Sequence, residues 1–130
     1  MNRHLLLTAI LAFGAYMAGG AVAGTALAAA DPAAGATVFK SQCSVCHSVQ
    51  PGRNQIGPSL AGVVGRKTGQ MPNFHYSVAN KGSGLTWDEA TLDRYLTSPR
   101  AVVPHTTMTY AGLKDDAKRA DLIAYLATLH

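Results

Sequence analysis

Residues 40–49, KSQCSVCHSV, hold both cysteines of the chain, Cys43 and Cys46, and place His47 directly after the second. A disulfide between the two would close a very small loop and add little stability. A redox dithiol of the thioredoxin type needs a βαβ context, which the sequence does not show. A structural zinc site needs four ligands, and no second ligand pair follows at a suitable spacing.

Cys-x-x-Cys-His is also the pattern of covalent haem attachment. Two thiols at this spacing lie on one helical turn and can form thioether bonds with the two vinyl groups of a haem. His47 then lies under the iron, where it is the expected proximal ligand. The pattern predicts one haem c, attached through Cys43 and Cys46. A site without haem stays the alternative until the rest of the chain is considered.

Residues 1–30 have the composition of a secretory signal peptide. A short basic start is followed by an uncharged, largely apolar run, and small residues around Ala28 and Ala30 fit a cleavage site. The run is long enough to cross a bilayer, so a retained membrane anchor is the alternative. Its Ala- and Gly-rich second half favours cleavage. We expect an exported, periplasmic protein whose mature domain covers residues 31–130.

The expected mature domain is only weakly basic. Arg3 is the only Lys, Arg, Asp or Glu in residues 1–30, so cleavage lowers the net charge from +4 to +3. The sequence has no cluster of Lys and Arg with interleaved aromatic residues. Nucleic acid is therefore not an expected partner.

Three segments have the patterns of helices: residues 31–43, 85–99 and 115–130. Asp31 is placed to cap the first segment, before a proline in its first turn. Thr86 and Glu89 have the spacing of a capping box at the start of the second, which Pro99 ends. In the third, an acidic first turn is followed by apolar residues at helical spacing, namely Leu122, Tyr125, Leu126 and Leu129.

Between His47 and Trp87 lie 39 residues rich in Gly, Pro, Ser and Asn, without sustained periodicity. A structureless segment of that length is unusual in a compact domain. A large, flat, apolar haem resolves the difficulty, because loops can wrap around it and use it as their core. The sequence therefore predicts an all-α domain built around a cofactor.

Two methionines follow the leader, and their surroundings differ. Met71 lies in a turn-like stretch, GQMPNF, and is expected at the surface or in packing. Met108 lies in VVPHTTMTYAG, a polar loop between the last two helical segments, where a core methionine is less expected. A thioether ligand favours Fe(II) and fills the sixth position of the iron. We expect Met108 to be the second axial ligand.

Together these segments resemble the class I cytochromes c, the small soluble bacterial and mitochondrial forms. The resemblance covers nearly all of residues 33–130. It rests on CSVCH, GPSLAGVVGRKTGQ, YSVANKGSGLTW, TLDRYLTSP, PHTTMTYAG and RADLIAYL. It implies three principal helices, with short helices and loops wrapped around one covalently bound haem. The first and last helices would cross at Gly35, Phe39, Leu122 and Tyr125.

The resemblance also implies roles for residues around the haem. Pro58 matches the residue whose carbonyl accepts the Nδ1 proton of the proximal histidine. The donors to the haem propionates are matched by Arg66, Tyr76 and Trp87. From the residues alone, Trp87 is equally a core residue and Arg66 a solvated loop charge.

Further matches surround the methionine. The polar network near Met108 is matched by Asn80, Tyr95 and Thr106. Tyr110 takes a position that usually carries an aromatic residue at the haem edge. Without the resemblance, Tyr95 would be a core residue and Asn80 a turn residue.

One departure from the family pattern concerns charge at the haem edge. Related proteins usually carry several lysines there. In residues 98–108, SPRAVVPHTTM, Arg100 is the only Lys or Arg, and two aspartates follow Lys114. We therefore expect weak electrostatic steering toward partners and little dependence of association on salt.

The expected function is one-electron transfer, with the iron cycling between Fe(III) and Fe(II) under His47/Met108 ligation. No acid–base pair or nucleophile arrangement indicates an enzyme, and no small-molecule substrate is expected. The expected partners are redox proteins, an electron donor and an electron acceptor, soluble or membrane-bound, and the carrier is expected to be a monomer. Two alternatives stay open. One is a haem c subunit dedicated to one oxidoreductase complex, and the other is a gas-binding or peroxidatic haem protein with a labile Met108.

Overall fold

The computed structural model describes residues 29–130, so the predicted signal peptide lies almost entirely outside the described residues. The described chain contains the helices α1 (Pro32–Gln42), α2 (Val78–Gly82), α3 (Glu89–Thr97), α4 (Pro99–Val102) and α5 (Asp116–Ala127). Over the same residues there is no strand, only one isolated bridge between Lys67 and Thr86. The predicted all-α architecture is confirmed. No helix in residues 29–130 is long and apolar enough to span a membrane.

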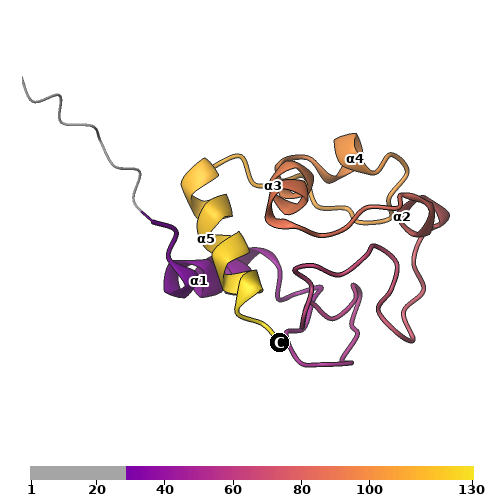
Figure 1. Cartoon of the computed structure of the whole chain (residues 1–130), viewed down its shortest axis with the longest axis horizontal. Coiled ribbons are helices and arrows are strands. Elements are labelled where there is room, and N and C mark those ends of the chain that lie inside the picture. The colour runs from indigo at the N-terminus through magenta and orange to yellow at the C-terminus, as the bar shows by residue number, and fades with distance from the viewer. Residues whose placement is uncertain (1–28) are drawn as a thin grey trace, which may run out of the picture.

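α1 and α5 come from opposite ends of the described chain and cross each other (Figure 1). Gly35 allows the close approach, because a Cβ atom there would lie 1.9 Å from the backbone oxygen of Asp121. The rings of Phe39 and Tyr125 pack against each other with their centroids 5.7 Å apart. Leu122 is fully buried. The predicted crossing of the first and last helices is confirmed.

The start of α3 differs from the prediction. Thr86 does not cap this helix; it lies in the isolated bridge. The N-cap is Asp88, whose Oδ1 accepts a hydrogen bond from the backbone N–H of Thr91 at 2.7 Å. The backbone N–H of Trp87 is taken by the carbonyl of Arg66 at 2.9 Å. This long-range bond holds Trp87 outside the helix, so α3 begins only at Glu89. The predicted capping box is therefore wrong.

The helices and the long segment before α2 enclose one core. In Figure 1 that segment, coloured purple to red, runs below α2, α3 and α4, and α5 lies beside them. α4 follows α3 after a single residue and starts at Pro99. The buried side chains come from α1, α3, α5 and the loops, and they form a single cluster. The core is therefore shared by segments that are distant in sequence.

Candidate haem-binding site

A cavity of about 520 Å³ lies among α3, α5 and the loops. Cavities of this size suit a cofactor. Twelve residues received a cofactor or metal role from the sequence, and all of them line this cavity: Cys43, Cys46, His47, Pro58, Arg66, Tyr76, Asn80, Trp87, Tyr95, Thr106, Met108 and Tyr110. The structure brings these residues together, while the role of each toward a haem stays a prediction.

Most of the remaining wall is apolar, and its residues have no cofactor-binding pattern in the sequence. It includes Leu60, Val63, Leu92, Leu96, Leu122 and Leu126. Helical spacing marks the leucines of α3 and α5 as core residues, but it does not show that this core surrounds a cavity. Ile56 and Phe74 also line the cavity. They lie in aperiodic loops, where no sequence signal identifies them.

The two cysteines lie where α1 ends. Cys43 is the C-cap of α1, and its carbonyl accepts bonds from the backbone N–H groups of Cys46 and His47 at 3.0 and 2.9 Å. The cysteines are half-buried and do not form a disulfide. Burial, reinforced by the neighbouring Cys46, raises the pKa of the Cys43 thiol to about 11. Before a haem is attached, the thiol is therefore protonated at neutral pH and slow to oxidise.

The ring of His47 is held in one orientation. Its Nδ1 lies 2.8 Å from the carbonyl oxygen of Pro58. Since a carbonyl can only accept, Nδ1 carries the proton and the lone pair is on Nε2. Gly57 makes room for the ring, because a Cβ atom there would lie 2.3 Å from its Cε1. Burial lowers the pKa of His47, opposed by the Pro58 bond, and so favours the neutral imidazole that binds metals.

The sulfur of Met108 is also held by a neighbour. The hydroxyl of Tyr95 donates to Met108 Sδ at 3.3 Å, and the backbone N–H of Met108 donates to Thr106 Oγ1 at 3.3 Å. Burial raises the pKa of Tyr95, so the hydroxyl keeps its proton. Asn80 lines the same cavity, but its buried Oδ1 has no hydrogen-bond partner. Of the three residues predicted for this network, Tyr95 and Thr106 contact Met108.

Arg66 provides a test of whether a haem suits this cavity. Its two terminal nitrogens donate to the carbonyls of Ala61 at 2.8 Å and Ser59 at 3.0 Å, while the buried Nε has no partner. Burial lowers the pKa of Arg66, but a guanidinium stays charged in proteins. A cationic donor beside a mainly apolar cavity suits a ligand with a large apolar body and carboxylate groups. A haem has both features.

Tyr76 and Trp87, the other two predicted propionate donors, differ in their present contacts. The hydroxyl oxygen of Tyr76 accepts a bond from the backbone N–H of Met71 at 3.2 Å, which leaves its own proton free to be donated. Trp87 is buried, and its ring centroid lies 4.6 Å from that of Tyr95. Trp87 is thus a core residue by its packing, whether or not it also donates to a propionate.

Comparison with known proteins gives consistent matches. A family model described as Cytochrome c matches residues 32–130. Cytochrome c2 of Rhodomicrobium vannielii is 56% identical over 107 residues, which cover 82% of this chain and 85% of that protein. Cytochrome c2 of Rhodoblastus acidophilus is 53% identical over 100 residues, or 76% of this chain and 92% of that one. Among solved structures, cytochrome cH from Methylobacterium extorquens superposes with a TM-score of 0.72 at 44% identity, covering 75% of this chain and 98% of that chain.

These matches agree with the geometry of the cavity. They establish the class I cytochrome c fold for the helical domain. They also establish a covalently bound haem c, and Cys43 and Cys46 have the spacing that its attachment requires. The activity is one-electron transfer between redox proteins and not enzymatic catalysis. The chain belongs to the cytochrome c family.

Proposed function

We propose that this cytochrome is a diffusible periplasmic carrier whose haem iron is coordinated by His47 and Met108. The observation that carries the ligation is the fixed ring of His47, whose Nδ1 is committed to Pro58 and whose Nε2 is available for a metal. Met108 lines the same cavity and supplies a thioether. Bound haem supplies the Fe(III)/Fe(II) couple. Two side-chain ligands leave no iron position for a substrate, which favours a carrier over a gas-binding or peroxidatic protein.

We assign the haem propionates to Arg66, Tyr76 and Trp87. Buried carboxylates need donors, because an unpaired buried charge is strongly disfavoured. Arg66 has a buried Nε without a partner, and Tyr76 has a hydroxyl proton to donate. Tyr110 lines the cavity and reaches α1 through its hydroxyl, which donates to Gln42 Oε1 at 3.2 Å. Such fixed side chains keep the pocket dry and limit its rearrangement when the iron changes charge.

We infer that docking to the electron donor and acceptor is mainly apolar. In residues 98–108, whose last three residues line the cavity, Arg100 is the only Lys or Arg. Val45, inside the attachment motif, is 78% exposed, and Ile56 at the cavity is 77% exposed. Short-range apolar contacts therefore guide association more than long-range charge does. The carrier is proposed to act as a monomer that residues 1–30 direct to the periplasm.

The ligation is tested by optical spectra of the holoprotein, oxidised, reduced and reduced under carbon monoxide, beside Met108→Ala. The wild type is expected to be low-spin, with the methionine–ferric charge-transfer band and no response to carbon monoxide. Met108→Ala is expected to lose the charge-transfer band and to bind carbon monoxide, since the side chain that blocks the sixth position is gone. Met71→Ala is the matched control, because Met71 does not line the cavity. A wild type that is high-spin or binds carbon monoxide would refute the carrier and favour a gas-binding protein.

Tyr95→Phe removes the hydroxyl that donates to Met108 Sδ. That donor draws electron density from the sulfur and disfavours Fe(III), so its loss is expected to lower the reduction potential. A hydrogen bond worth about 0.5–1 kcal/mol corresponds to about 20–40 mV for one electron. Redox titration measures the shift. The control is Tyr125→Phe, which alters a ring packed on Phe39 outside the cavity; equal potentials in wild type and Tyr95→Phe would refute the effect.

The docking proposal predicts a shallow dependence of electron-transfer rate on salt. Between about 0.01 M and 0.15 M ionic strength the Debye length shrinks from about 30 Å to about 8 Å, which suppresses any steering by distant charges. Stopped-flow rates with the native acceptor are expected to change little over this range. Arg100→Gln, which removes an exposed cation at the start of α4, is expected to leave the profile unchanged. A steep fall in rate with salt would contradict apolar docking.

A further inference from the structure

The segment that carries Met108 is held at its far end by α3. We call residues 103–115, between α4 and α5, the methionine loop. The backbone N–H of Leu113 donates to the carbonyl of Leu96 in α3 at 2.8 Å. Gly112, with φ of 106°, lies so close to α3 that a Cβ atom would be 2.2 Å from the backbone oxygen of Thr97. This end of the loop is therefore seated on the last turn of α3.

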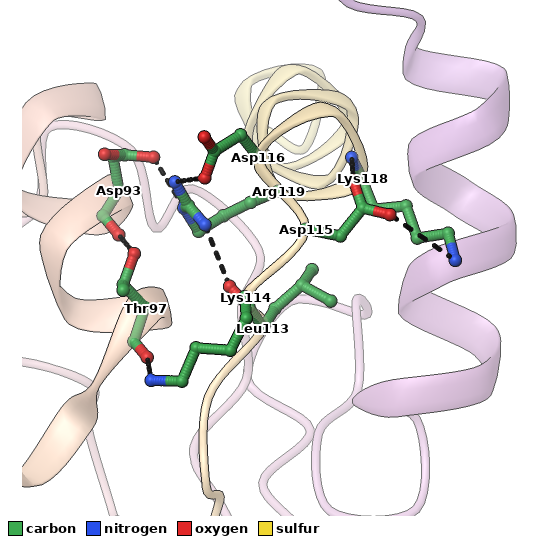
Figure 2. A network of polar contacts seen from close by, with 8 residues as sticks. All are labelled: Asp93, Thr97, Leu113, Lys114, Asp115, Asp116, Lys118 and Arg119. Carbon is green, nitrogen blue, oxygen red and sulfur yellow. Dashed lines mark hydrogen bonds and ion pairs between the residues drawn. The ribbon is translucent and has the colours of Figure 1, made fainter.

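Arg119 of α5 also binds Leu113, so that this end of the methionine loop is held by α5 as well as by α3 (Figure 2). It is 6% exposed, and all three of its nitrogens donate. Nη1 donates to the carbonyl of Leu113 at 2.9 Å, Nε to Asp93 Oδ1 at 2.6 Å and Nη2 to Asp116 Oδ1 at 2.8 Å. Leu113 is thus bonded through its N–H to α3 and through its carbonyl to α5. Since Asp93 lies on α3, one guanidinium joins α3, the methionine loop and α5.

The carboxylates around Arg119 favour its charged form. Hydrogen bonds to Asp93 and Asp116 outweigh burial and raise the pKa of Arg119. Lys114, the next loop residue, donates from Nζ to the carbonyl of Thr97 (Figure 2). A neutral residue in place of Arg119 would leave a buried backbone carbonyl without a partner, which is strongly unfavourable. The junction therefore consists of several hydrogen bonds to one buried guanidinium, and not of a single surface ion pair.

α3 holds the methionine loop at two points. The hydroxyl of Tyr95 on α3 donates to the sulfur of Met108, and the last turn of α3 seats Leu113. Only residues 109–112 separate Met108 from Leu113, so a shift of Leu113 is transmitted over a short span. Arg119 does not line the cavity. Its influence on the iron site therefore passes through the loop.

We propose that Arg119 is a positioning residue that sets how readily Met108 leaves the haem iron. The inference rests on the proposed Met108 ligation. It assigns to Asp93 and Asp116 the function of holding the guanidinium in place. Loss of the junction is expected to loosen the methionine loop before it unfolds the domain, because the α1–α5 crossing lies outside the junction.

The test is titration of the ferric holoprotein with imidazole, which binds the iron only when Met108 has moved away. Arg119→Lys keeps the charge, but one ammonium cannot replace a fork that reaches three acceptors. We expect the apparent imidazole affinity to rise about tenfold, equivalent to about 1.4 kcal/mol, with a weaker methionine–ferric charge-transfer band. Asp93→Asn keeps an acceptor and removes its charge, so a smaller rise in the same direction is expected.

Two controls separate positioning from a general loss of stability. Lys118→Gln changes the residue before Arg119 in the sequence. Lys118 is exposed, and its Nζ pairs with Asp115 Oδ2 at 3.7 Å. Asp31→Ala removes the side-chain N-cap of α1 and is expected to lower the melting temperature. The backbone N–H of Asp31 bonds to Asp121 of α5, but Asp31 makes no bond to Arg119 or to its three partners. Both variants are expected to bind imidazole as the wild type does.

The outcomes distinguish a failure of the proposed Arg119 role from a failure of the proposed Met108 ligation. An Arg119→Lys protein that melts lower but binds imidazole as the wild type does would overturn the positioning role. If Arg119→Lys yields no holoprotein, Asp93→Asn decides, and unchanged affinity there overturns the role equally. A wild type that is already high-spin before imidazole is added would instead overturn Met108 ligation, and with it the inference that depends on it.

Discussion

The haem is the core that the helices of this protein share, and the rest of the structure depends on its being held there. Leucines of α3 and α5 face a cavity of about 520 Å³. Apolar walls around such a volume are stable only when it is filled, since the destabilisation grows with each unfilled Å³. Covalent attachment through Cys43 and Cys46 makes the filling permanent. A domain of about 100 residues can then manage with a long, aperiodic segment, because that segment packs on the cofactor.

The proposed ligands come from distant parts of the chain, and each is oriented by a different device. His47 follows the turn after α1, and its ring is oriented by the carbonyl of Pro58. Met108 lies in the methionine loop, where Tyr95 holds its sulfur and Arg119 holds the end of its loop. Rigid surroundings on both sides of the iron suit a carrier, because a site that hardly moves transfers an electron with little reorganisation.

Local patterns were sufficient to predict the elements whose causes are local. α1 follows from the Asp31 cap and the proline after it, and the spacing of Cys43, Cys46 and His47 identifies haem attachment without any tertiary information. The α1–α5 crossing at Gly35 was implied by the resemblance to cytochromes c, and it fits the general rule that a glycine in a helix interior is unfavourable unless close packing requires it.

The errors and omissions have tertiary causes. The capping box at Thr86 fails because the neighbouring residue, Trp87, bonds to Arg66, which is distant in sequence. The carbonyls of Ser59 and Ala61 that hold the Arg66 side chain carry no sequence signal, since every residue has a carbonyl. The same holds for the Leu113 carbonyl that Arg119 binds. Such contacts appear only when the chain is folded.

The central claim, that the haem serves as the core, is tested most directly on the same chain made without haem. Expression of the mature domain in cells that lack a haem-attachment apparatus would yield this form. We expect far-ultraviolet circular dichroism to show a largely unfolded chain with no cooperative melting, because too little side-chain core remains. The holoprotein should be helical and melt in one transition. A haem-free protein that is helical and melts cooperatively would contradict the account.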